Sequence, residues 1–188
     1  MKLSRLLLAV TGAAGVLVTT RAEAWDPVEL DAAIRLGSAT SPGWVASPYG
    51  FGFGGHAGVS VYGFYGGLSA MYYLGGSAEG AGFHTLLVGV EAGYTFKLKS
   101  LRLRPQVGVG SGTFTESASD GVNNPPITTS VGNIYVEPGL VLFVPVGPIF
   151  LGADANALLL PHFTLATPDA TAKTYASFSA HGQIGVFF

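Results

Sequence analysis

Most of this chain alternates apolar and polar residues at every second position. From Leu86 to Lys97, one face carries Leu, Val, Val, Ala, Tyr and Phe, and the other carries Leu, Gly, Glu, Gly, Thr and Lys. The same period recurs in Leu101–Gly110 and in Ser177–Phe188. A period of two predicts β-strands with one apolar face, whereas glycines and β-branched residues interrupt every helical window.

Eight segments of this kind predict eight strands. They span residues 28–37, 52–63, 67–75, 83–97, 101–111, 131–144, 149–160 and 175–188. Two prolines, Pro105 and Pro138, fall inside predicted strands. Because proline removes a hydrogen bond of the ladder, we expect bulges or local bends at both positions.

The connections between these strands alternate in length. The long ones are residues 38–51, 76–82, 112–130 and 161–174, and the tight ones lie around residues 64–66, 98–100 and 145–148. Long loops at one end and short turns at the other are typical of outer-membrane barrels. No segment beyond the N-terminal region offers 18 consecutive apolar residues, so the sequence does not favour a helical membrane span.

The N-terminal segment has the pattern of a signal peptide. Lys2 and Arg5 precede the apolar run Leu6–Val18, and Ala22 and Ala24 provide the small residues of a cleavage site. We therefore expect residues 1–24 to be a signal peptide and residues 25–188 to form one exported barrel domain. An N-terminal membrane anchor is the alternative interpretation of the same segment.

The composition indicates which face of the strands meets which solvent. The 188 residues are 48% hydrophobic and only 11% charged, with a mean hydropathy of +0.45. This small number of charges cannot cover a surface that faces water. We therefore expect the apolar faces to point outward into lipid. The formal net charge of −2 excludes a basic nucleic-acid interface, and the lack of cysteine excludes disulfides and cysteine-based metal sites.

Together with the terminal Phe188, these features resemble the small outer-membrane β-barrels of the OmpA and OmpX type. The resemblance implies an all-β fold, a transmembrane antiparallel up-and-down barrel of eight strands, in the bacterial outer membrane. It also implies that outer-membrane lipid and the barrel assembly machinery are the partners. In that family the last strand carries the assembly signal, and the matching residues here are Phe178, Ile184, Val186 and Phe188.

Alternation places nearly every charge within a strand on the predicted lumen face. These residues are Asp31, Arg35, Glu91, Arg102, Arg104, Glu137 and Asp154. Because a lone buried charge is costly, we expect a network of ion pairs in which Glu91 meets Arg104 across the turn at residues 98–100. Isolated charges solvated by water are the alternative.

Aromatic residues near the strand ends predict two interfacial girdles. The girdle at the tight turns would comprise Trp25, Phe64, Tyr94, Phe96, Phe143, Phe150 and Phe188, and the girdle at the long loops would comprise Tyr49, Phe51, Phe53, Tyr72, Phe83 and Tyr175.

Candidate catalytic patterns are weak. Gly50–Gly55 contains G-x-G-x-x-G but lies outside any βαβ unit, and the four histidines lack the spacing of metal ligands. His181, Ser179 and Asp154 form the one arrangement that could support acyl transfer, but Ser179 and His181 stand about 7 Å apart on one strand. We therefore predict no enzymatic activity, no cofactor and no metal.

The sequence thus predicts a non-enzymatic outer-membrane anchor whose loops carry any recognition. Residues 112–130 are the best candidate loop and would expose Phe114, Asp120 and Asn123. A narrow porin-like channel or a conduit for small hydrophobic molecules remains an alternative. A soluble periplasmic, lipocalin-like ligand carrier is a second alternative, but it would need more surface charge than this chain has.

Overall fold

The fold is all-β in every part of the chain that the structure describes. The computed structural model describes residues 28–41, 47–78, 81–118, 127–163 and 173–188. The strands are β1 (Val28–Thr40), β2 (Gly50–Val61), β3 (Phe64–Ala78), β4 (Ala81–Tyr94), β5 (Phe96–Leu98), β6 (Leu101–Ala118), β7 (Ile127–Val146), β8 (Ile149–Phe163) and β9 (Lys173–Phe187). Within these ranges no helix is long and apolar enough to cross a membrane.

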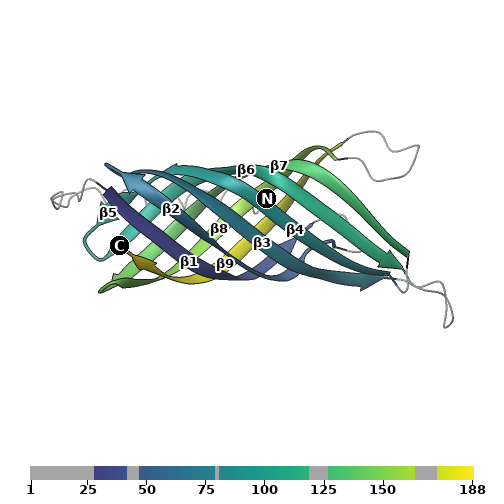
Figure 1. The fold of residues 1–188 in the computed structure, drawn as a ribbon, viewed down its shortest axis with the longest axis horizontal. Helices are drawn as coiled ribbons and strands as arrows, with labels where there is room; N and C mark the ends of the chain where they lie inside the picture. The colour runs from purple at the N-terminus through teal and green to yellow at the C-terminus, as the bar shows by residue number, and fades with distance from the viewer. Residues whose placement is uncertain (1–27, 42–46, 79–80, 119–126, 164–172) are drawn as a thin grey trace, which may run out of the picture.

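The strands close into an antiparallel barrel (Figure 1). β4 and β5 form one strand of the wall, interrupted at Thr95, so the wall has eight strands. Each strand pairs with its neighbour in sequence, and β1 pairs with β9 from Asp31↔Phe187 to Thr40↔Phe178. Closure leaves no sheet edge along this seam, which a barrel in lipid requires.

The two ends of the barrel differ in their connections. At one end, here called the turn end, tight turns join the strands at Tyr62–Gly63, Lys99–Ser100 and Gly147–Pro148. Tyr62, Gly63 and Gly147 have positive φ angles of 51°, 86° and 65°, as the tight turns of hairpins require. The opposite end, the loop end, is where β1, β3, β6 and β8 finish, on the right of Figure 1.

The sequence correctly predicts the strands but makes them too short at the loop end. β6 and β7 pair as far as Ala118↔Ile127, so most of the predicted loop 112–130 is a hairpin. The connection predicted at residues 76–82 contains only residues 79–80 between β3 and β4. The turn expected at residues 64–66 lies at Tyr62–Gly63. The polar Ser, Thr and Gly residues in these segments look like loop but pair as strand.

Both strand prolines interrupt the ladder without the predicted bulge. Pro105 faces the break between β4 and β5, where pairing with β6 stops at Gly93↔Gln106 and resumes at Phe96↔Leu103 in the same register. Pairing of β7 with β8 is likewise absent next to Pro138 and keeps its register on either side. Each proline lacks a backbone donor, so the ladder loses pairs locally but keeps its alignment.

The apolar faces of the strands point outward and the polar faces point inward. Large exposed hydrophobic residues occur on all eight wall strands, including Ile34 on β1, Leu68 on β3 and Val90 on β4. The buried polar residues, among them Asp31, Arg104 and His181, lie on the inner face. This orientation is the reverse of a lipocalin-like carrier, whose apolar residues would line the interior.

The predicted aromatic girdles are correct only in part. Among the turn-end residues, Phe64, Phe96 and Phe188 are exposed on the exterior, but Phe143 and Phe150 are fully buried inside the barrel. At the loop end, Phe51 and Phe53 are exposed and Tyr72, Phe83 and Tyr175 are half-buried, whereas Tyr49 is buried in the lumen. Phe143 is an even number of residues from Glu137 on β7. Because side chains alternate between the two faces of a strand, this parity places Phe143 on the same inner face as Glu137. Trp25 lies outside the described residues.

Candidate functional site

The seven charged residues predicted for the lumen all lie on the inner face of the barrel. Asp31, Arg35, Glu91, Arg104 and Asp154 are buried, and Arg102 and Glu137 are half-buried. The expected pairing of Glu91 with Arg104 is wrong, because each has a different partner. The partners come from strands on opposite sides of the wall, so the interactions cross the lumen.

Arg104 on β6 is the most completely buried charge of the described residues. Its guanidinium donates to the Asp31 carboxylate at 2.7 Å and to the Thr95 hydroxyl at 2.9 Å. It also lies 3.6 Å from the ring centroid of Tyr65. Asp31 additionally contacts His56 Nε2 at 3.1 Å. The wall is interrupted at Thr95, and there the Thr95 hydroxyl points into the lumen and accepts the hydrogen bond from Arg104.

A second group surrounds Arg35 on β1. Its guanidinium donates to both carboxylate oxygens of Glu91, at 2.8 and 3.2 Å, and lies 3.7 Å from Asp154. Such a bidentate pair fixes both geometry and charge. Glu137 on β7 accepts a hydrogen bond from Ser179 at 3.2 Å, and the described residues provide no ion pair for it. This group therefore contains three carboxylates and one guanidinium.

The three residues considered for acyl transfer do not form a catalytic triad. His181 Nδ1 lies 2.6 Å from Asp154, but His181 Nε2 lies 2.8 Å from the Tyr73 hydroxyl rather than at Ser179. Ser179 donates to Glu137 instead. Both ring nitrogens of His181 are therefore occupied by other partners, so the histidine is not placed to take a proton from the Ser179 hydroxyl.

A third polar group lies near the turn end. Glu29 accepts hydrogen bonds from Lys97 and from Arg102, and the Arg102 guanidinium lies 4.0 Å from the Phe187 ring centroid. Sequence reasoning did not identify Glu29 or Lys97, although their strand parity matches that of Asp31 and Glu91. Sequence reasoning also missed Tyr65 and Tyr73. Tyrosine has both an apolar ring and a polar hydroxyl, so its presence in an alternating pattern does not indicate whether it faces lipid or the lumen.

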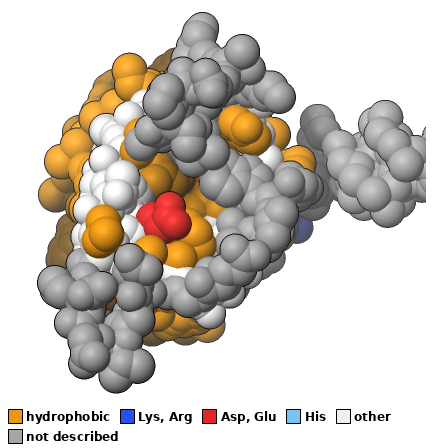
Figure 2. All heavy atoms as spheres, turned by 90° about the vertical axis from the view of Figure 1, so that its right-hand side faces the viewer, with side chains coloured by type: hydrophobic (Ala, Val, Ile, Leu, Met, Phe, Trp, Pro, Cys, Tyr) orange, Lys and Arg blue, Asp and Glu red, His pale blue; other side chains and the backbone are white. Residues whose placement is uncertain are grey.

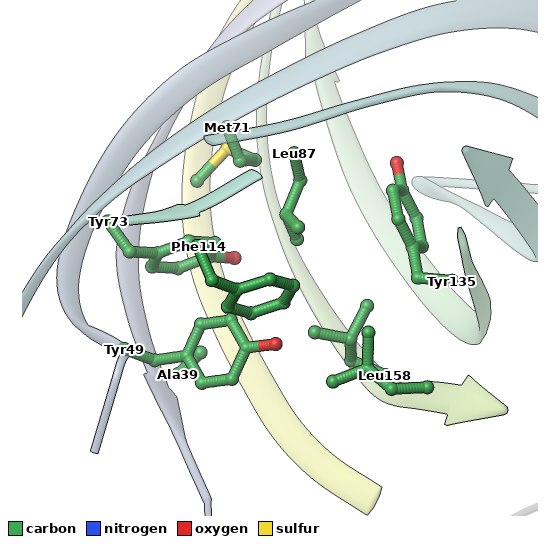
Figure 3. Close-up of a cluster of buried hydrophobic side chains, with 9 residues drawn as sticks. Ala39, Tyr49, Met71, Tyr73, Leu87, Phe114, Tyr135 and Leu158 are labelled. Carbon is green, nitrogen blue, oxygen red and sulfur yellow. The ribbon is translucent and has the colours of Figure 1, made fainter. Parts of the chain in front are cut away.

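Apolar side chains fill the remaining lumen. Val141, Phe143 and Phe150 form one cluster, packed against Ala33 and Phe187. The other, here called the aromatic cluster, lies toward the loop end (Figure 3). It comprises Ala39, Tyr49, Met71, Tyr73, Leu87, Phe114, Tyr135, Leu158 and Leu160. Phe114, predicted to be an exposed loop residue, is therefore buried, and Asp120 and Asn123 lie outside the described residues.

Residues 47–49 turn inward at the loop end and place Tyr49 in the aromatic cluster. The Thr85 hydroxyl donates to the Pro48 carbonyl at 2.8 Å, and the Gly76 amide donates to the Ser47 carbonyl at 3.0 Å. The Tyr49 ring meets Tyr73 and Phe114 edge to face, with centroids 5.5 and 5.9 Å apart. Its hydroxyl has no hydrogen-bond partner within the described residues.

The other predicted site residues are placed as follows. Phe178 and Ile184 of the proposed assembly signal are exposed on the exterior, Val186 is half-buried, and Phe188 is 76% exposed. Ala22 and Ala24, the predicted cleavage site, lie outside the described residues. In the described part of the chain, no group of three or more His, Asp or Glu residues is arranged to hold a metal ion.

A closed antiparallel barrel with an apolar exterior and a charged, filled lumen defines a small transmembrane β-barrel of the outer-membrane type. Solved structures similar to it in fold are of this class. Neisserial surface protein A matches with a TM-score of 0.59 at 16% identity, over 88% of this chain and 100% of that one. A major outer membrane protein from Thermus thermophilus matches with a TM-score of 0.63 at 10% identity, over 86% and 99%.

These likenesses confirm the predicted fold. No protein-family model matches the chain, and no curated protein sequence matches it significantly. The outer membrane is the location in which barrels of this fold reside.

Proposed function

We propose that this protein is an integral outer-membrane barrel that serves as a non-conducting, non-enzymatic anchor for surface-exposed strands and loops. The observation that carries the proposal is the division of the wall into an apolar exterior and a lumen filled by paired charges and aromatic rings. The proposal includes removal of residues 1–24 on export, insertion by the barrel assembly machinery, and lipid as the main partner of the exterior.

The filled lumen supports the anchor over a channel. An eight-stranded barrel has an interior that side chains just fill. Here Arg104, Val141, Phe143 and Phe150 are each 0% exposed, and they come from three neighbouring strands of the wall. The ion pair of Arg35 with Glu91 joins β1 to β4 across the lumen, at a different position along the barrel axis. Passage of ions would require several of these contacts to break together.

The hairpin of β6 and β7 supports a role at the cell surface. Near its tip the outward positions change from Val107 and Val109 to hydroxyl residues. Thr115 and Ser130 form a hydroxyl pair at 3.0 Å, as do Ser117 and Thr128 at 3.4 Å. Ser111, Thr113, Thr128 and Ser130 are exposed, and lipid would not favour their hydroxyl groups, so we place this tip above the bilayer.

Single-cysteine labelling in intact Gram-negative cells tests the location and orientation, since the chain has no native cysteine. Ser117→Cys at the loop end should react with a membrane-impermeant maleimide. Ser100→Cys at the turn end should react only after the outer membrane is permeabilised, and Val90→Cys in the middle of β4 should not react in either case. Labelling of Val90→Cys in intact cells, or equal labelling at both ends, would contradict the proposed topology.

Planar-bilayer recording tests the non-conducting anchor. Purified barrel should give no steady single-channel current. A stable, protein-dependent current would instead support the narrow channel or conduit considered from the sequence. Deletion of residues 119–126 should leave the recording unchanged, because the buried side chains inside the barrel are expected to be enough to block the lumen.

A further inference from the structure

One strand of the wall is paired on a single side at the loop end. β6 pairs with β7 as far as Ala118↔Ile127, whereas the ladder of β7 with β8 ends at Val136↔Leu159. Residues 127–135 of β7, here called the free edge, therefore pair with β6 on one side and with none of the described residues on the other. The end of β8 stands apart from the start of β7 in Figure 1.

The other strand edges at the loop end are shorter and are contacted by the connection between β1 and β2. β3 and β9 extend past their neighbours β2 and β1, but by fewer residues. The Gly76 amide of β3 donates to the Ser47 carbonyl at 3.0 Å, and the Ser41 hydroxyl lies 2.6 Å from that of Ser177 on β9. Among the described residues, no such contact from a connection reaches the free edge.

The free edge lacks the features that usually shield an exposed strand, which are charged side chains, prolines and bulges. It reads Ile-Thr-Thr-Ser-Val-Gly-Asn-Ile-Tyr and pairs with β6 without a shift of register. Residues 127–130 are all exposed, so both faces of the strand are open there. Because successive residues direct their backbone groups to opposite sides, every second residue presents an N–H and a C=O without a strand partner.

The surroundings of the free edge are mostly uncharged. Figure 2 looks onto the loop end and shows hydrophobic and other uncharged side chains around an acidic one. In residues 111–118 and 127–136, Glu116 is the one charged residue, and it is exposed on β6 opposite Thr129. This edge therefore suits an uncharged partner strand that carries a basic residue near Glu116.

A second copy of the chain is a poor fit, a step that rests on the proposed function. Two copies in one membrane point the same way, so their β7 strands run in the same direction. A two-fold axis along such strands places each N–H of the edge opposite the same N–H of the other copy, and no ladder forms.

We propose that the free edge of β7 binds an extended peptide segment of another protein, which joins the sheet as a further strand. In this mode backbone hydrogen bonds supply the affinity and side-chain contacts select the partner. At about 3.3 Å per residue, residues 127–135 span about 30 Å, so a segment of about six to nine residues can pair. The expected segment is rich in β-branched residues and contains Lys or Arg.

The test uses the acetylated and amidated peptide Lys-Thr-Val-Thr-Val-Thr-Val-Lys and a copy N-methylated at its six central residues, which has the same side chains without their backbone donors. Amide hydrogen exchange is followed by NMR on the folded full barrel in detergent micelles. Without peptide, every second amide of residues 127–135 should exchange quickly. The first peptide should slow these amides at least tenfold, and the N-methylated copy should not.

Two shortened hairpins provide matched variants. Replacement of residues 116–129 by Asn-Gly removes the tip of the free edge together with Glu116 and leaves a two-residue turn between Thr115 and Ser130, so it should weaken peptide binding at least tenfold. Replacement of residues 119–126 by Asn-Gly keeps the whole edge and should leave binding unchanged. The folded band on an unheated gel should be present for both.

Slow exchange of these amides without peptide would show that the chain itself covers the edge, and would overturn the proposal. Equal protection by the two peptides, or by neither, would do so too. Protection that rises with barrel concentration alone would replace the peptide by a second copy. Because these measurements are made in detergent, their failure is distinguishable from a failure of the cysteine labelling in cells.

Discussion

The ion pair of Asp31 and Arg104 offers a sharp test of how the lumen is stabilised. The two groups are 2% and 0% exposed and meet at 2.7 Å. Asp31→Asn leaves a buried guanidinium without its carboxylate, a change that typically costs about 3–5 kcal/mol. The Tyr65 ring at 3.6 Å remains and contributes about 2 kcal/mol to a desolvated cation. We therefore expect a loss near the lower limit, about 3 kcal/mol.

The double variant separates pairing from packing. Arg104→Met in the Asp31→Asn background removes the unpaired cation and fills much of the same volume with an apolar chain. Because replacement of a buried pair by apolar residues is often neutral, the double variant should be more stable than the sum of the single losses predicts. The coupling energy should be about 2–3 kcal/mol, at the upper end of values for residues in contact.

The measurement is equilibrium urea unfolding in lipid vesicles, followed by far-UV circular dichroism and by the folded band on an unheated gel. Glu116→Gln serves as the control for loss of one exposed charge. If each single variant costs less than about 1 kcal/mol and the two effects add, water solvates the lumen charges and the paired network is not what stabilises the barrel.

Two further pairs of substitutions test the two faces of the wall. Gly52→Ala would place a methyl group against the Tyr73 ring and should cost about 1–3 kcal/mol in the same assay, whereas Gly66→Ala, which meets no atom within 4 Å, should leave stability unchanged. Val90→Arg on the exterior should cost about 2–4 kcal/mol in vesicles, and Ser117→Arg near the hairpin tip should cost less than about 1 kcal/mol, as unfolding midpoints will show. Equal costs within either pair would contradict the assignment of the faces.

The sequence predicts the fold well because the fold depends on local alternation. Period two assigns Glu91 and Asp154 to one face and Val90 to the other without knowledge of any partner. The tight turns at Lys99–Ser100 and Gly147–Pro148 are equally local, since each needs only small or turn-forming residues at one place.

The pairing inside the lumen is not local, and here prediction fails. Which side chains meet depends on the tilt and stagger of the strands, which bring Arg35 of β1 to Glu91 of β4 across the barrel. Sequence neighbours across a turn, such as Glu91 and Arg104, are the obvious pair only when the wall is imagined flat. The misplaced Phe143 and Phe150 have a different origin, because the girdle prediction uses their distance from a strand end and ignores their parity.

The seam between β1 and β9 has a consequence for how the protein folds. The pair Asp31↔Phe187 joins residues from the first and last strands, so this contact forms only when nearly all of the described chain is present. Until then both strands expose unpaired backbone groups and apolar side chains, which favour aggregation in water and are costly in lipid. Contacts so distant in sequence also form slowly. The chain therefore needs protection from its surroundings until its last strand arrives, and closure of the seam is the step that removes the last unpaired edges of the sheet along this seam.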